Sequence, residues 1–447
     1  MRLPKSLSVV LAIIALSPVS AAWGEGPYPV AWIRQLGTPS DEWGTGVSAD
    51  RVGNVYVTGS TRGALGGPSA GGEDIFLSKY SASGNLLWSR QLGTPSEEAS
   101  YAVSADALGN VYVGGYTDGS LGGPNAGGED AFLGKYDANG NLQWLRQFGT
   151  RAYEDCYSVS PDGLGNVYVS GHTTGDLGGP PAGQKDAFLG KYDADGNLLW
   201  MRQFGTEGNE RGYGVSADGR GDVYIAGYTS GPLVNPEGHG VDAFLGKYDE
   251  LGNLVWMCQF GALAPATARG VSADGVYGVY VSGETLGSLG GPNAGAADAF
   301  LSKYDIEGNP LWARQLGTAG EDGSRAVSAD GLGNVYISGH TRGSLAEPNA
   351  GDNDVFVSKY DAEGNLLWTR QIGTTAADLS YGVSADGLGN VYLTGYTRGS
   401  LGGPNAGAYD VFLIKLSIPE PHHLAILSIC AMALRRRRQG GDRRPPQ

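Results

Sequence analysis

Aspartates recur at fixed spacing along this chain, and carboxylates are the side chains that most often hold cations or act as acids and bases. Seven of them stand 56 residues apart, each close to a turn rich in Gly and Asn: Asp50, Asp106, Asp162, Asp218, Asp274, Asp330 and Asp386. A ring of such residues around a channel could hold a cation. An Asp at this place also caps a tight turn by accepting backbone hydrogen bonds. We expect the turn, because the Gly and Asn recur with the Asp.

A second set of repeated charges joins an arginine two residues after a Trp to an acid ten residues after it. The predicted pairs are Arg34 with Glu42, Arg90 with Glu98, Arg146 with Glu154, Arg202 with Glu210, Arg314 with Asp322, and Arg370 with Asp378. The remaining copy has lost both partners, since it carries Cys258 and Ala266. Because one copy lacks both the arginine and the acid, we predict that the two form a structural ion pair in the other copies. Each pair would contribute about 0–1 kcal/mol to stability if exposed.

A calcium-binding acidic rim is the alternative use of these acids. The sequence has no Asp-x-Asp-x-Asp-Gly spacing, and the nearest segment, Asp193–Asn197, is typical of a hairpin turn. We therefore expect no cofactor, with calcium as the open alternative.

A lysine recurs in the same way, seven times from Lys79 to Lys415. A catalytic lysine would be singular, so this one is predicted to pair between structural units with a repeated carboxylate. Asp74 and its six equivalents are available in every unit.

Histidines and cysteines offer little chemistry. His172 and His340 occupy the position that is Tyr in other copies, which indicates a strand aromatic replaced by imidazole. His239 lies in a divergent loop with Glu237 and Asp242, and a convergent cluster there would indicate an enzyme. The three cysteines, at 156, 258 and 430, fit neither paired disulfides nor a zinc site. No catalytic or metal-binding residue is predicted.

The elements that position these side chains follow from a strict repeat. Seven tryptophans stand 56 residues apart, at 32, 88, 144, 200, 256, 312 and 368, without insertion or deletion over 32–416. The second copy contains four β-rich runs, 101–105, 110–116, 131–136 and 141–148, separated by Gly and Asn. Four strands per unit predict the blade of a β-propeller, an all-β fold.

The order of the runs predicts how the ring closes. The ordered region opens with a lone fourth strand at 31–36 and ends after a third strand at 411–416. Seven complete blades exist only if the N-terminal strand completes the last one, which also removes exposed sheet edges. We predict a seven-bladed propeller over 32–416, closed by pairing between the strand at Trp32 and the strand at Phe412.

These units resemble the SBBP family of β-propeller repeats. The resemblance rests on Gly-Val-Ser-Ala-Asp-x-x-Gly-Asn-Val-Tyr-Val and on Asp-x-Phe-x-x-Lys-Tyr-Asp-x-x-Gly-Asn, over all of 32–416. It implies the fold and a place outside the cytoplasm, but no shared reaction.

Both ends of the chain predict export. Residues 1–21 have the layout of a secretory signal, a basic start, an apolar run and small residues, and 22–31 form a lead segment. The tail, 417–447, resembles the PEP-CTERM sorting signal of Gram-negative bacteria. Its parts are Pro419-Glu420-Pro421, an apolar run, and Arg435, Arg436, Arg437 and Arg438. The resemblance implies an exosortase as partner and a destination at the cell surface or extracellular matrix, with membrane contact only through the tail.

Composition narrows the function classes. With 41% apolar residues the chain can bury a core, and a net charge of −15 argues against a nucleic-acid partner. Departures from the repeat look few and scattered along the sequence, which favours a non-enzymatic binding or scaffold protein for extracellular polysaccharide or a surface protein. The alternative is a polysaccharide hydrolase or lyase with a site at the channel mouth, since a fold alone excludes no activity.

Overall fold

In the computed structural model, the described residues are 28–234, 240–261, 264–275 and 278–417, and every regular element among them is a strand. One compact unit spans Ala31–Ser417. The predicted signal segment, the sorting motif, Cys430, Glu237 and His239 lie outside the described residues. No helix in the described ranges is long and apolar enough to cross a membrane.

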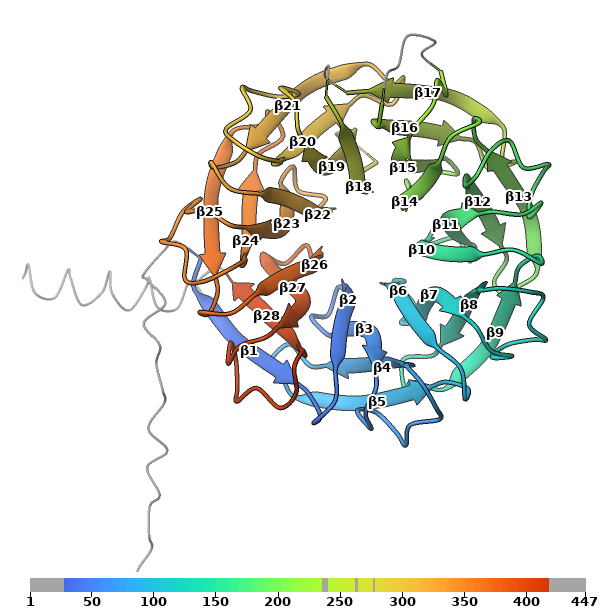
Figure 1. The fold of residues 1–447 in the computed structure, drawn as a ribbon, viewed down its shortest axis with the longest axis horizontal. Coiled ribbons are helices and arrows are strands. Elements are labelled where there is room, and N and C mark those ends of the chain that lie inside the picture. Colours follow the sequence, from blue (N-terminus) through green and yellow to red (C-terminus); the bar gives the residue numbers. More distant parts are fainter. Residues whose placement is uncertain (1–27, 235–239, 262–263, 276–277, 418–447) are drawn as a thin grey trace, which may run out of the picture. The chain divides into compact units, whose positions relative to one another are not determined.

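The strands form seven four-stranded antiparallel sheets arranged as blades around a central opening (Figure 1). The innermost strands are β2 (Glu42–Ala49), β6 (Glu98–Ala105), β10 (Glu154–Pro161), β14 (Glu210–Ala217), β18 (Ala266–Ala273), β22 (Asp322–Ala329) and β26 (Asp378–Ala385). The second strands are β3 (Val55–Thr61), β7 (Val111–Thr117), β11 (Val167–Thr173), β15 (Val223–Thr229), β19 (Val279–Thr285), β23 (Val335–Thr341) and β27 (Asn390–Thr397). The third strands are β4 (Asp74–Tyr80), β8 (Asp130–Tyr136), β12 (Asp186–Tyr192), β16 (Asp242–Tyr248), β20 (Asp298–Tyr304), β24 (Asp354–Tyr360) and β28 (Asp410–Ser417). The outermost strands are β5 (Leu86–Leu92), β9 (Leu142–Phe148), β13 (Leu198–Phe204), β17 (Leu254–Phe260), β21 (Pro310–Leu316), β25 (Leu366–Ile372) and β1 (Val30–Leu36).

The ring closes as the sequence predicts. One sheet has the order β1-β28-β27-β26, so the first strand completes the blade formed by the last three; we number that blade 7 and the blade beginning with β2 blade 1. The closing blade repeats the bonds of the others: Gln35 Nε2 donates to Asp410 Oδ2 at 2.8 Å, as Gln91 Nε2 donates to Asp74 Oδ2 at 2.7 Å. Closure gives every blade its full four strands, so the third strand β28 is not left as an edge.

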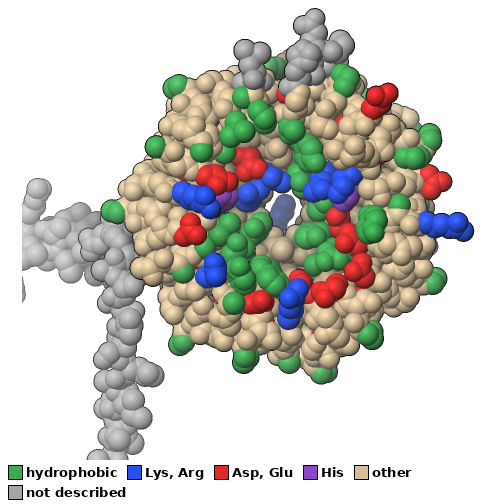
Figure 2. Space-filling model, in the orientation of Figure 1, with side chains coloured by type: hydrophobic (Ala, Val, Ile, Leu, Met, Phe, Trp, Pro, Cys, Tyr) green, Lys and Arg blue, Asp and Glu red, His purple; other side chains and the backbone are tan. Residues whose placement is uncertain are grey.

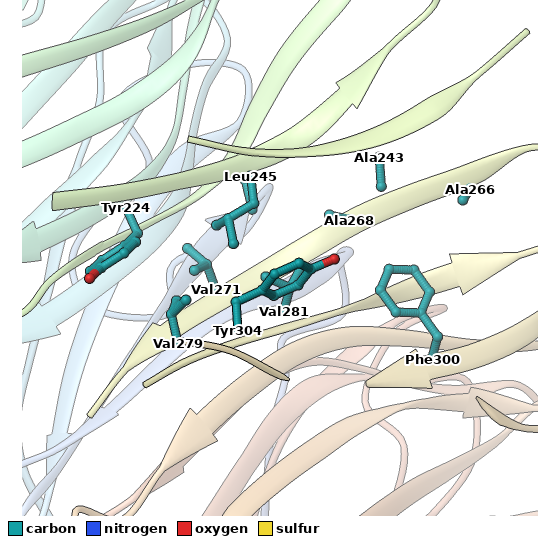
Figure 3. Packing of buried hydrophobic residues seen from close by; sticks show 11 residues of the cluster. Tyr224, Ala243, Leu245, Ala266, Ala268, Val271, Val279, Val281, Phe300 and Tyr304 are labelled. Atoms are coloured by element: carbon teal, nitrogen blue, oxygen red, sulfur yellow. The ribbon is translucent and has the colours of Figure 1, made fainter. Parts of the chain in front are cut away.

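Apolar side chains pack between blades rather than within one central core. The two middle strands of a blade face a neighbour on each side, which explains their uninterrupted apolar runs. Tyr56 and Phe76, with most of their equivalents, are the largest fully buried side chains. Figure 3 shows one such layer, in which Tyr224 and Leu245 of blade 4 pack against Val281 and Phe300 of blade 5.

The repeated Trp fastens the outer rim. Trp32 Nε1 donates to the carbonyl of Ala82 in the next blade at 3.1 Å, and its ring lies against Gly84. A Cβ on Gly84 would come within 2.9 Å of that ring, and the backbone there has φ +77°. Only glycine both lacks a Cβ that would clash with the ring and adopts a positive φ at low cost, which explains why Gly-Asn is repeated in this turn.

Candidate functional site

The two ends of the channel differ in how uniform they are. At one end, which we call the uniform mouth, all seven copies of the repeated aspartate from Asp50 to Asp386 line a cavity of about 420 Å³. At the other end, which we call the variable mouth, a cavity of about 790 Å³ is lined by side chains that differ from blade to blade. Figure 2 views the face that carries the variable mouth, where basic side chains lie beside the two histidines and acidic side chains form an arc along the lower right of the opening.

The aspartates of the uniform mouth form turns, as predicted. Asp50 Oδ1 accepts bonds from the backbone N–H of Val52 at 3.0 Å and of Asn54 at 2.8 Å, and Oδ2 accepts from Asn54 Nδ2 at 2.8 Å. Asp106 makes the same bonds in the next blade. These carboxylates are therefore engaged in holding the hairpins.

No three or more His, Cys, Asp or Glu residues in the described ranges are grouped so that they could hold a metal ion. The calcium alternative stays a prediction without an assigned set of ligands.

The predicted arginine–acid pairs are wrong, because the two side chains lie on different parts of the blades. Arg34 is on an outermost strand, where its Nε donates to Gly84 O of the next blade at 2.7 Å. Glu42 begins an innermost strand and is fully buried. It accepts bonds from Thr38 N at 2.8 Å, Thr38 Oγ1 at 2.5 Å and Thr61 Oγ1 at 2.9 Å.

The other copies follow the same scheme with one variation. Arg90, Arg146, Arg202 and Arg314 donate to the next blade's hairpin, while Arg370 Nε contacts Glu347 Oε1 at 2.7 Å. Four of the buried acids accept from the hydroxyls of two threonines, namely Glu98, Glu154, Glu210 and Asp322, whereas Asp378 accepts from Thr374 N and Thr374 Oγ1. In the copy with Ala266, the threonine equivalent to Thr38 is Ala262, so the acid is lost together with its true partner.

The repeated lysine does link units, but not to the repeated aspartate. Lys79 Nζ donates to Ala138 O in the next blade at 3.1 Å and lies 5.0 Å from the ring centroid of Tyr56. Asp74 is used by Gln91 instead. A lysine–carboxylate pair forms where Asp222 replaces the usual Asn, 2.7 Å from Lys247.

The histidines are strand side chains, as predicted, and both are buried. Burial lowers the pKa of His172 to about 3, assisted by the positive charges of Lys185 and Arg211. Burial and the charge of Arg325 lower the pKa of His340 to about 4. Asp242 plays the same structural role as Asp74 and the other repeated aspartates: its Oδ2 accepts a hydrogen bond from Gln259 Nε2.

A β-bulge aims the variable side chains into the variable mouth. Each innermost strand skips its fourth residue when it pairs with the second strand, as between Gly44 and Gly46 in β2. Bulges redirect a side chain and are common beside functional sites. The seven bulged residues all line the cavity: Thr45, Tyr101, Tyr157, Tyr213, Arg269, Arg325 and Tyr381.

This convergence overturns the expectation of scattered departures from the repeat. Tyrosines occupy the bulge on blades 2, 3 and 4, and their rings adjoin: Tyr101 and Tyr157 have centroids 5.3 Å apart, and Tyr157 and Tyr213 are 5.0 Å apart. The signal was available in the sequence, since this column holds Thr, Tyr or Arg while the residues on both sides of it are always small, Gly, Ala, Ser or Cys. It needs the bulge, however, to be recognised as facing one cavity.

Acidic groups on blades 1 to 3 flank the tyrosines. Burial raises the pKa of Glu129 to about 7, with the negative charges of Asp155 and Asp118 adding to the effect and Lys185 opposing it. Burial also raises the pKa values of Glu73 and Asp155. Carboxylates with raised pKa values are typical of functional sites.

Seven four-stranded antiparallel blades place the chain among the β-propellers. Its repeats identify it further. Six segments match the SBBP family, described as Beta-propeller repeat: 31–66, 87–122, 143–178, 199–233, 311–345 and 367–402. The chain therefore carries SBBP β-propeller repeats.

Two curated proteins are similar over part of their length. The chain is 27% identical over 345 residues to Regulatory protein FlaEY of Caulobacter vibrioides, covering 67% of this chain and 35% of that protein. It is 21% identical over 461 residues to an uncharacterized WD repeat-containing protein, L264, of Acanthamoeba polyphaga mimivirus, covering 82% and 31%. The chain thus spans about a third of the length of each relative.

Solved structures of varied function share a looser likeness. An ulvan lyase of polysaccharide lyase family PL25 has a TM-score of 0.46 at 13% identity, covering 85% of this chain and 95% of that one. Drosophila Plexin A, in complex with Semaphorin 1b, has a TM-score of 0.47 at 7% identity, covering 88% of each chain.

Proposed function

We propose that this protein is an extracytoplasmic binding protein that holds a saccharide at its variable mouth without transforming it. The observation that carries the proposal is the convergence of the seven bulged side chains on one cavity. Elsewhere the repeated polar groups bond to one another, whereas here the blades contribute three kinds of side chain, Thr, Tyr and Arg. A concave cavity of about 790 Å³ lined by tyrosines and a few charges suits a short segment of a chain ligand better than a flat protein surface.

Binding is favoured over catalysis by the protonation states at the mouth. A general base works best when its pKa lies near the working pH. His172, with a pKa of about 3, is a weak base, and burial raises the pKa of Tyr157 far above neutral pH. Both side chains are therefore neutral at pH 7 and suited to hydrogen bonding.

The second candidate is an enzyme acting on polysaccharide, a hydrolase or lyase, and Glu129 is the observation that favours it. Its pKa of about 7 is suited to proton transfer at neutral pH. The two candidates differ in whether the saccharide leaves the mouth unchanged.

Export and sorting complete the proposal. The secretory layout of residues 1–21 and the Pro-Glu-Pro, apolar and Arg parts of 417–447 support delivery by an exosortase to the outer surface or matrix of a Gram-negative-type bacterium. Fractionation of the native host with mass spectrometry of the C-terminus tests this point. Loss of the Arg-rich end is expected, and an intact end on purely soluble protein would refute processing.

Calorimetric titration of the purified chain with dextran, mannan, alginate and polygalacturonate tests the binding function. We expect saturable binding of at least one, lost in the double variant Tyr101→Ala and Tyr213→Ala. The matched control, Leu108→Ala with Leu332→Ala, changes exposed side chains in the turns between β6 and β7 and between β22 and β23, and it should bind normally. Binding that survives the tyrosine variant, or no binding of any of the four, would overturn the proposal.

The same mixtures distinguish the two candidates. Unchanged chain length after prolonged incubation supports a binding protein. New reducing ends, or the ultraviolet absorbance of an unsaturated uronate, would establish the enzyme instead, and Glu129→Gln should then abolish the reaction.

A further inference from the structure

We infer that the ligand of the variable mouth is an acidic saccharide and that Arg211 binds its anionic group. This inference rests on the proposed function, because it takes the mouth as the binding site. It names the class of ligand, a sugar chain that carries a carboxylate or a sulfate.

Arg211 differs from the two other arginines on its side of the mouth. Arg269 and Arg325, on the next two blades, share Glu284: Arg269 Nη2 lies 2.6 Å and Arg325 Nη1 3.5 Å from its Oε1. Although burial opposes it, these two arginines hold the pKa of Glu284 below its usual value. One carboxylate thus serves two guanidinium groups.

Arg211 itself has no carboxylate within 4 Å among the described residues. Its Nη1 donates to Tyr213 Oη at 3.3 Å, and its buried Nε has no hydrogen-bond partner in the described part of the chain. A guanidinium group presents its donors as a planar fork that matches a carboxylate or a sulfate. An unpaired one in a cavity wall is costly unless a ligand completes its bonds.

The aromatic side chains beside Arg211 are held in fixed positions. Tyr157 Oη donates to Asp155 Oδ2 at 2.9 Å, and its ring stacks on His172 with centroids 5.6 Å apart. The Arg211 guanidinium lies 6.0 Å from the centroid of the Tyr157 ring. The ring face of Tyr157 and the hydroxyl of Tyr213 therefore lie beside the free donors of Arg211, and a flat apolar face next to a charged group suits a sugar ring that carries an anion.

The acidic side chains near the mouth indicate whether the ligand carries a single negative charge or many. Glu73 lines the same cavity, and the charge of Glu129 on blade 2 acts on Tyr101 and Tyr116, which also line it. Carboxylates accept hydrogen bonds from sugar hydroxyl groups, but they repel a chain with a charge on every unit, such as a nucleic acid. A sugar chain with one anionic group and many hydroxyl groups suits both Arg211 and the acids on blades 1 and 2.

Isothermal titration of the full chain with three trisaccharides tests the inference: a galactotriose in which one unit is galacturonate, a galactotriose with one sulfate, and neutral galactotriose. We expect either anionic probe to bind at least tenfold more tightly than the neutral one, and the stronger of the two identifies the anion. Arg211→Gln should weaken the anionic probe about tenfold or more while leaving the neutral probe within about twofold. Arg220→Gln, an exposed arginine of the same blade in the turn between β14 and β15, is the matched control and should change neither.

Tyr213→Phe keeps the ring and removes only the hydroxyl that holds Arg211, so it tests the same contact if Arg211→Gln folds poorly. A smaller loss, confined to the anionic probes, is expected. Equal affinity for all three probes with no effect of Arg211→Gln would overturn the inference while leaving the mouth as a saccharide site. Binding of none of the probes or polysaccharides would overturn the proposed function, and tighter binding of a triaspartate peptide would overturn the saccharide as ligand.

Discussion

The two mouths of one channel show what repetition does to polar side chains. At the uniform mouth, the repeated aspartate stands beside a turn rich in Gly and Asn, and its carboxylate accepts hydrogen bonds from its own hairpin. At the variable mouth, the bulged position carries Thr, Tyr or Arg, and Arg211 beside it has no carboxylate partner in the described chain. Repeated polar groups stabilise the ring, whereas varied groups leave donors and aromatic faces for a ligand.

The largest effect is expected from removing a buried repeated acid. Glu98→Ala leaves Thr94 N–H, Thr94 Oγ1 and the fully buried Thr117 Oγ1 without their acceptor, and should lower the free energy of unfolding by about 3 kcal/mol. Guanidinium titration measures it, and saccharide affinity should not change.

The natural loss of both partners in the copy with Ala266 sharpens this prediction. Thr94→Ala with Glu98→Ala should cost clearly less than the sum of the single changes, because no buried acceptor is left unpaired. Strict additivity would contradict the hydrogen-bonded pair.

A smaller effect is expected from His172→Tyr, which restores the residue found at Tyr116. The folded pKa of about 3 lies below the unfolded value near 6.5, so His172 supports the fold fully above about pH 6.5 and destabilises it as the pH falls. The variant should gain about 2 kcal/mol over the parent at pH 5 relative to pH 7.5. Unfolding titrations at both pH values measure it, and an equal difference at both would rule out the histidine.

At the uniform mouth, Asp106→Ala should cost about 1 kcal/mol, since three bonds that hold an exposed turn are lost. The affinity for the galactotriose with one galacturonate unit should stay within the error of the titration. A marked loss of binding would mean that the aspartate ring, rather than the variable mouth, contacts the ligand.

The smallest effect concerns the pH dependence of binding. Glu129 faces Asp155, Asp118 and Lys185, and its pKa of about 7 means that it loses its negative charge as the pH falls from 8 to 6. The acidic saccharide stays ionised over this range, so its affinity should rise about threefold as repulsion decreases. Glu129→Gln should bind equally at both pH values, and a persistent pH dependence would assign it to another group.

The sequence by itself determined the number of blades, the four strands of each and the closure by the first strand. A 56-residue repeat with Trp32 at its start and Phe412 at its end leaves one way to pair every strand. It also indicated the aspartate turns, because the residues that make them are adjacent in the chain.

Contacts between blades could be decided only by the tertiary structure. Arg34 and Glu42 are eight residues apart, yet one lies on the outer rim and the other begins an innermost strand, so co-occurrence suggested a bond that the fold forbids. The variable mouth depends on a bulge that turns one residue per blade toward the channel. Residues about one repeat apart become neighbours only when successive blades pack side by side, and that is why Tyr101, Tyr157 and Arg211 form a site that no local pattern contains.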